Sequence, residues 1–116
     1  MGAAGSSQVV EKQIFSSPVV MYTAHKCNYC VKAADILDRQ DIKYKTYVMD
    51  MGAGGRDYVL ALRNLTGISS VPQLFVCGQF VGGYNELVRL VANDRLRPLV
   101  DECSSEVLDQ RRRKFS

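Results

Sequence analysis

The chain has 116 residues, enough for one domain that buries a core of its own. Hydrophobic residues make up 47% of it and the formal net charge is +3, which is typical of a soluble globular protein and too weakly basic to indicate a nucleic-acid-binding protein. No apolar run is long enough to span a bilayer, and residues 1–20 lack the pattern of a secretory signal. We therefore expect a cytoplasmic protein without a transmembrane segment, whose four cysteines are mostly reduced.

The first half of the chain alternates between helical and strand patterns. Residues 1–8 are small and polar and are expected to form a disordered tail. A short helix is expected over 9–15, a buried strand over 19–22, a helix over 30–40 and a second strand over 44–48. The glycine-rich segment 52–55 is expected to be a flexible connection.

The second half adds a hairpin and more helices. The pattern predicts a helix over 56–66, a strand over 72–77, a turn at Gly78-Gln79, a strand over 80–83 and a helix over 84–92. Apolar positions from 96 to 107 favour one final helix, followed by a basic tail over 109–116. This order predicts an α/β fold with a four-stranded mixed sheet flanked by helices, in one domain over 9–108.

Cys27 and Cys30 form a C-x-x-C pair at the start of a predicted helix. The first N–H groups of a helix are unpaired and lie at the positive end of its dipole, so the pKa of a thiol placed there falls. The thiolate is the species that attacks disulfides, and Lys26 and His25 add positive charge beside Cys27. Cys30, one turn further on, is expected to be buried and to attack a mixed disulfide on Cys27.

Other interpretations of the cysteines are open. A C-x-x-C pair is half of a structural zinc site, but the remaining donors, His25, Cys77 and Cys103, are single and scattered, so we expect no metal site. A structural disulfide across so short a loop gains little. Cys77 and Cys103 fall on buried strand and helix positions, which favours inert core cysteines over a regulatory thiol or an intermolecular disulfide.

Several motifs resemble those of glutaredoxins. Residues 27–30, Cys-Asn-Tyr-Cys, resemble the family's Cys-Pro-Tyr-Cys, with Asn28 in place of proline. Residues 70–75, Ser-Val-Pro-Gln-Leu-Phe, resemble its Thr-Val-Pro-x-hydrophobic-Phe segment, and Gly82-Gly83 its later glycine pair. Residues 96–100, Leu-Arg-Pro-Leu-Val, resemble Leu-x-Pro-Leu-Leu. The resemblance covers 9–103 and implies a thioredoxin-like fold and a dithiol, glutathione-dependent thiol–disulfide oxidoreductase.

The resemblance also implies a site and its ligand. Cys27 and Cys30 would be catalytic, and the protein would act on protein disulfides and on protein–glutathione mixed disulfides. The Val71–Pro72 bond would be cis, so that the backbone of Val71 pairs with glutathione beside Cys27. The γ-glutamyl carboxylate would bind at the helix start after the glycine pair, where Asn85 is also placed to cap the helix. The implied glutathione-binding residues are Lys26, Tyr29, Val71, Pro72, Gly83, Tyr84 and Asn85.

The chain departs from the family at three positions. Because Asn28 replaces proline, the resemblance leaves open a [2Fe-2S] cluster shared between two subunits, with Cys27 as a ligand; without it we expect a monomer. Ala24 stands where the family has a lysine for the glycyl carboxylate, and Val59 where it has a polar residue. These changes leave the affinity for glutathione open, and with it the alternative of an interaction domain without glutathione chemistry.

The two tails suggest a membrane contact. Residues 1–6, Met-Gly-Ala-Ala-Gly-Ser, fit the N-myristoylation pattern at Gly2, and the basic run 111–114 supplies a second signal. Two solvated tails are the simpler interpretation, which we favour.

Overall fold

The computed structural model describes residues 2–49 and 55–115. Six helices and four strands are found in these residues: α1 (Gly2–Ile14), β1 (Val19–Thr23), α2 (Asn28–Arg39), β2 (Lys45–Val48), α3 (Gly55–Thr66), β3 (Gln73–Val76), β4 (Gln79–Gly82), α4 (Tyr84–Ala92), α5 (Leu96–Asp101) and α6 (Ser105–Phe115). In these residues, no helix is both long and apolar enough to cross a bilayer.

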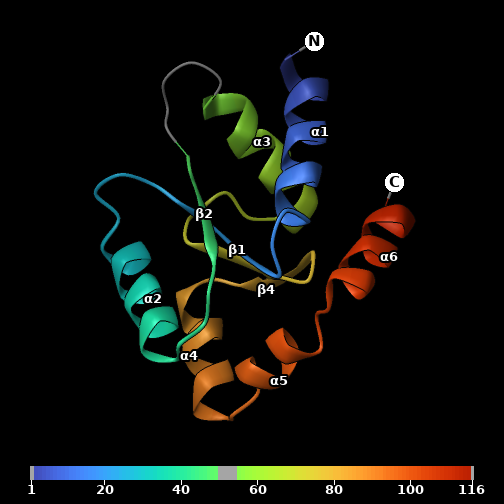
Figure 1. The fold of residues 1–116 in the computed structure, drawn as a ribbon. Coiled ribbons are helices and arrows are strands. Elements are labelled where there is room, and N and C mark those ends of the chain that lie inside the picture. Colours follow the sequence, from blue (N-terminus) through green and yellow to red (C-terminus); the bar gives the residue numbers. More distant parts are fainter. Residues whose placement is uncertain (1, 50–54, 116) are drawn as a thin grey trace.

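The strands form one mixed sheet in the order β2-β1-β3-β4. β1 pairs with β2 in parallel, with Thr23 opposite Val48, whereas β1–β3 and β3–β4 are antiparallel. The parallel pair needs the crossover through α2, while β3 and β4 are joined by a tight turn. The expected four-stranded mixed sheet with flanking helices is thereby confirmed (Figure 1).

Helices cover the two faces of the sheet and enclose two cores. In β1, Val19 and Met21 point into the core beneath α2 and α4, while Val20 and Tyr22 point into the core beneath α1 and α3. The Tyr22 hydroxyl donates to Gln13 Oε1 at 2.9 Å, and burial raises the pKa of Tyr22, so this hydroxyl stays protonated. The central strands β1 and β3 are buried on both faces, which holds the C-terminal end of β1 and the N-terminal end of β3 at the edge where the cysteine loop begins.

The β3–β4 turn is built from Cys77 and Gly78, one residue earlier than expected, and both have positive φ. A Cβ at Gly78 would overlap the ring of Phe15, so a glycine fits there. Cys77 forms a disulfide with Cys103, and its carbonyl accepts a hydrogen bond from Arg111 Nη1 at 3.2 Å. These contacts attach α6 to the turn.

At both ends of the described chain, the helices differ from those expected from the sequence. A helix begins at Gly2, where a disordered tail over 1–8 was expected. The expected single last helix is two, because the chain bends at Cys103, and the Ser104 hydroxyl accepts from Val107 N at 3.1 Å at the start of α6. The basic residues lie on α6 rather than on a tail over 109–116. Most of the predicted flexible connection 52–55 lies outside the described residues; Gly55 begins α3.

Candidate active site

Cys27 occupies the N-cap position of α2. Its backbone is extended (φ −104°, ψ 102°), and its Sγ accepts a hydrogen bond from Cys30 N at 3.2 Å. A sulfur in this position satisfies one of the unpaired N–H groups at the helix start and lies at the positive end of the helix dipole. The placement expected for the reactive sulfur is therefore found in the structure.

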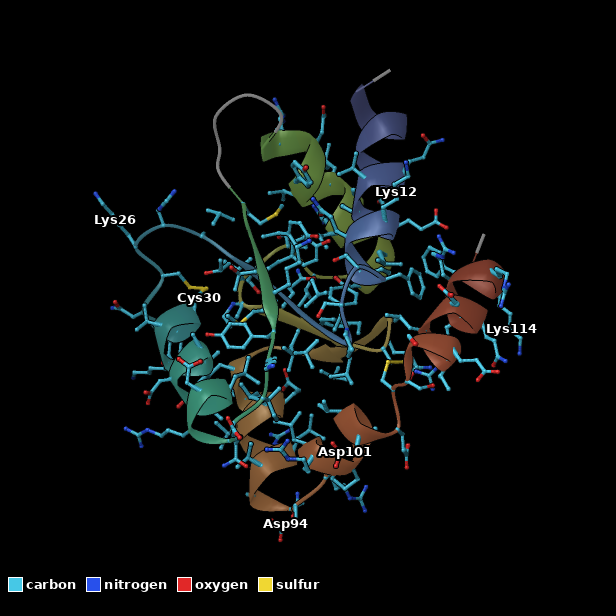
Figure 2. The ribbon with its side chains drawn as sticks, viewed as in Figure 1. Lys12, Lys26, Cys30, Asp94, Asp101 and Lys114 are labelled. Carbon is cyan, nitrogen blue, oxygen red and sulfur yellow. A yellow bond between two sulfur atoms is a disulfide. The ribbon has the colours of Figure 1, made fainter. Side chains whose placement is uncertain are left out.

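Cys30 lies inside the first turn of α2 and is bonded to Cys27 (Figure 2). The side chain of Cys30 is 3% exposed, whereas Cys27 is partly exposed. The two Cα atoms are 5.2 Å apart, within the range that a disulfide requires. This unequal exposure leaves Cys27 as the sulfur that an outside thiol or disulfide reaches first, and Cys30 as its internal partner.

The loop before β3 faces the cysteine pair. The Val71–Pro72 peptide bond is cis, as the resemblance implied, and the Val71 carbonyl oxygen lies 3.8 Å from Cys27 Sγ. Pro72 is buried, and Val71 is partly exposed. An extended peptide whose sulfur reaches Cys27 would therefore lie next to the backbone of Val71.

A cleft of about 360 Å³ opens beside these residues. Six of the predicted site residues line it, together with Ile68, Ser70 and Glu86: Tyr29, Val71, Pro72, Gly83, Tyr84 and Asn85. The rings of Tyr29 and Tyr84 are 5.2 Å apart and connect the start of α2 to the start of α4. Lys26 does not line the cleft; it is exposed at the tip of the loop, with φ 58° (Figure 2).

The start of α4 contains a residue that the sequence reasoning missed. The Glu86 carboxylate accepts a hydrogen bond from Gly83 N at 2.7 Å, so the chain itself satisfies one N–H group at the predicted carboxylate site. Gly83 is in close contact with the Pro72 carbonyl, 3.2 Å from where a Cβ would lie, and Gly82 has φ +131°. The spacing of Glu86 three residues after Gly83 was the signal available in the sequence.

Gln73 is the second residue that was missed. It is the one buried polar residue of the described core, and its Nε2 donates to the carbonyls of Ile68 (2.9 Å) and Ser70 (3.0 Å). Its Oε1 lies 3.1 Å from the Thr66 hydroxyl, which donates a hydrogen bond to it. Gln73 therefore fixes the loop 66–70, which forms one wall of the cleft.

No metal-binding group of three or more His, Cys, Asp or Glu side chains occurs within 2–49 and 55–115. Cys77 and Cys103 are bonded to each other on another part of the molecule, and His25 is exposed. The donors considered for a zinc site are thus not brought together.

The glutaredoxin family model matches residues 19–81, more than half of the chain. The chain belongs to the glutaredoxin family. It is 32% identical over 105 residues to the mitochondrial glutaredoxin-2 of Bos taurus, a match that covers 89% of this chain and 67% of that protein. The chain spans only 60% of the corresponding Mus musculus protein, with 34% identity.

Solved glutaredoxin structures confirm the thioredoxin-like fold. Oxidized glutaredoxin 2 from Chlamydomonas reinhardtii superimposes with a TM-score of 0.82 at 31% identity, over 90% of this chain and 99% of that one. A buckwheat glutaredoxin–glutathione complex gives a TM-score of 0.84 at 25% identity, over 88% and 93% of the two chains. As a glutaredoxin with two cysteines in its motif, this chain has the dithiol arrangement.

Proposed function

We propose that this glutaredoxin is a thiol–disulfide oxidoreductase in which Cys27 is the nucleophile and glutathione is the reducing co-substrate. The observation that carries the proposal is the position of the Cys27 sulfur, partly exposed, at the start of α2, and 3.8 Å from the Val71 carbonyl oxygen at the cleft. Dipole and N–H donors stabilise a thiolate there, so we expect the pKa of the Cys27 thiol to lie below that of an ordinary cysteine.

The reaction is a series of thiolate exchanges. The Cys27 thiolate attacks the glutathione sulfur of a protein–glutathione disulfide; the S–S bond breaks and the protein leaves as a thiolate that takes up a proton. A glutathione thiolate then attacks the Cys27–glutathione bond and releases Cys27 and glutathione disulfide. With a protein disulfide, Cys30 instead attacks the mixed disulfide on Cys27 and closes the Cys27–Cys30 bond, which two glutathione molecules reduce.

Glutathione fits the cleft by size and by its polar groups. Val71 offers backbone partners to an extended tripeptide, and Tyr84 and Asn85, which line the cleft at the start of α4, offer N–H groups for the γ-glutamyl carboxylate. The likeness to the glutathione-bound buckwheat protein supports this choice. Because Ala24 supplies no charge to the glycyl carboxylate and Val59 supplies no polar group, we expect glutathione to bind weakly, which raises KM more than it lowers kcat.

The test is a glutathione-coupled assay with a glutathionylated protein as substrate. Cys27→Ser is expected to abolish turnover, because the attacking sulfur is lost, while Cys30→Ser keeps much of it, because glutathione resolves the adduct. Equal loss in both variants would point to an obligatory dithiol route, and an inactive wild-type protein would overturn the proposal.

A further inference from the structure

The first turns of α2 expose Val31 and Lys32, which lie outside the cleft, beside Tyr29, which lines it. Val31 is 69% exposed and Tyr29 is 56% exposed, the two highest values for large hydrophobic side chains among the described residues. Lys32 is exposed as well, and its Nζ lies 5.1 Å from the centre of the Tyr29 ring. With about 100° of turn per residue, Tyr29 and Val31 lie about 160° apart around the helix, and Lys32 lies between them. We call these three residues the α2 ridge.

The α2 ridge borders the reactive sulfur but extends outside the cleft. Tyr29 lines the cleft, whereas Val31 and Lys32 do not. Cys27 caps the same helix within five residues of all three. A tripeptide that fills the cleft would not need Val31 or Lys32, so these side chains are within reach only of a substrate that continues past the sulfur.

The charge of this region is positive. Lys26 and Lys32 lie on either side of the cysteine pair, and residues 24–32 contain no acidic side chain. The next acidic residue on α2, Asp35, is paired with Arg39 at 3.0 Å. Across the cleft, the Glu86 carboxylate is bonded to Gly83 N. Lys26 and Lys32 therefore make the segment around Cys27 positively charged, while Glu86 adds a negative charge across the cleft.

We propose that the α2 ridge is the docking surface for protein substrates whose reacting cysteine is flanked by acidic and apolar residues. The inference rests on the proposed function and specifies its substrate class. Lys32 attracts an acidic neighbour of the target cysteine, while Tyr29 on one side of Lys32 and Val31 on the other each offer a contact to an apolar neighbour. Electrostatic attraction of this kind acts mainly on the rate of encounter, so the selectivity appears in kcat/KM and weakens with salt.

The test uses three short glutathionylated peptides that differ only in the residues beside their single cysteine: Glu, Gln or Lys. The wild-type protein is expected to reduce the Glu peptide about tenfold faster, in kcat/KM, than the Lys peptide at low ionic strength. Acidic neighbours also make the departing thiol a poorer leaving group, which works against this preference and cannot mimic it. Near 1 M salt, where the Debye length is about 3 Å, the preference is expected to disappear.

Lys32→Glu is expected to cut the Glu-over-Lys preference to about twofold or less. Lys43→Glu is the matched control. It makes the same charge change at an exposed position before the N-terminal end of β2, whereas the cysteine loop lies near the C-terminal end of β2. This variant should keep the full preference. Because each protein is judged by a ratio between peptides, a change in Cys27 reactivity cancels. Equal rates for the three peptides, or equal effects of the two variants, would overturn the proposal while leaving the function intact. A wild-type protein inactive on all substrates would overturn both.

Discussion

The two disulfides of this glutaredoxin differ in loop length and in exposure to solvent. Cys27–Cys30 spans three residues at a helix start, and one of its sulfurs is partly exposed beside a cleft. Cys77–Cys103 spans 26 residues, and its two residues are only 2% and 8% exposed. Thiol–disulfide exchange requires an attacking thiolate to reach a sulfur, so access separates the two pairs.

From this difference we expect the Cys27–Cys30 disulfide to exchange with outside thiols and the Cys77–Cys103 disulfide to stay inert. The Cys27 sulfur lies at the start of α2, where unpaired N–H groups can stabilise a thiolate, and it accepts a hydrogen bond from Cys30 N. Cys77–Cys103 lies under α6, where Arg111 binds the Cys77 carbonyl. The first pair is placed for chemistry, and the second connects the β3–β4 turn to the last helix.

The largest expected contrast is in activity. Cys27→Ser removes the nucleophile and should lower turnover by at least three orders of magnitude, whereas the double variant Cys77→Ser/Cys103→Ser should keep more than half of it. The glutathione-coupled assay measures both. A comparable loss in the Cys77/Cys103 variant, with its circular dichroism unchanged, would show that the buried pair takes part in turnover.

For stability, we expect the larger effect from loss of the Cys77–Cys103 disulfide. Removing a disulfide that closes a loop of this length destabilises a protein by about 3 kcal/mol, so Cys77→Ala/Cys103→Ala should unfold at lower urea than the wild type. Cys27→Ala/Cys30→Ala is the matched control. It removes a disulfide that closes a far shorter loop, so its free energy of unfolding should fall by less. Urea unfolding without reductant compares them, and an equal or larger loss in the Cys27/Cys30 variant would contradict the assigned roles.

The wall beside the reactive pair depends on Gln73. Gln73→Leu leaves the Ile68 and Ser70 carbonyls without their donor, which is expected to lower the free energy of unfolding by about 2 kcal/mol. Since the loop 66–70 contributes to the cleft, KM for the glutathionylated substrate should rise more than kcat falls. Gln79→Leu, at an exposed position of β4, is the control. An unchanged KM in Gln73→Leu would show that Gln73 does not shape the cleft.

The smallest effect is expected at Glu86. Glu86→Gln keeps an acceptor for Gly83 N but removes a negative charge from the start of α4, so glutathione should bind about twofold more tightly there. Glu106→Gln removes a comparable charge from the first turn of α6 and should leave glutathione binding unchanged. Calorimetric titration of the reduced proteins distinguishes the two, and weaker binding in Glu86→Gln would argue against a carboxylate at this helix start.

The sequence predicted the sheet and the placement of the C-x-x-C pair from local signals, and the resemblance to glutaredoxins implied six of the residues that line the cleft. The Cys27–Cys30 spacing and the Val71–Pro72 segment each carry their own pattern. The Cys77–Cys103 bond was missed because pairing across 26 residues depends on how the elements pack, and cysteine counting leaves it open. Gln73 was missed because its partners are carbonyls, which every residue has.

At the ends of the chain, the sequence signals were weak. The glycine- and serine-rich start resembles a disordered segment, although α1 begins at Gly2 and packs against α3. Gly2 acylation, the [2Fe-2S] alternative, the monomeric state and the cytoplasmic location stay predictions.

The ionisation of Cys27 tests the central claim most directly. In Cys30→Ser, with Cys77 and Cys103 still bonded to each other, Cys27 holds the one titratable thiol, and its thiolate absorbance can be followed against pH. We predict that the pKa of the Cys27 thiol lies well below that of a free cysteine, because the N–H groups and dipole at the start of α2 stabilise the thiolate. A pKa at or above the free-cysteine value would contradict the account.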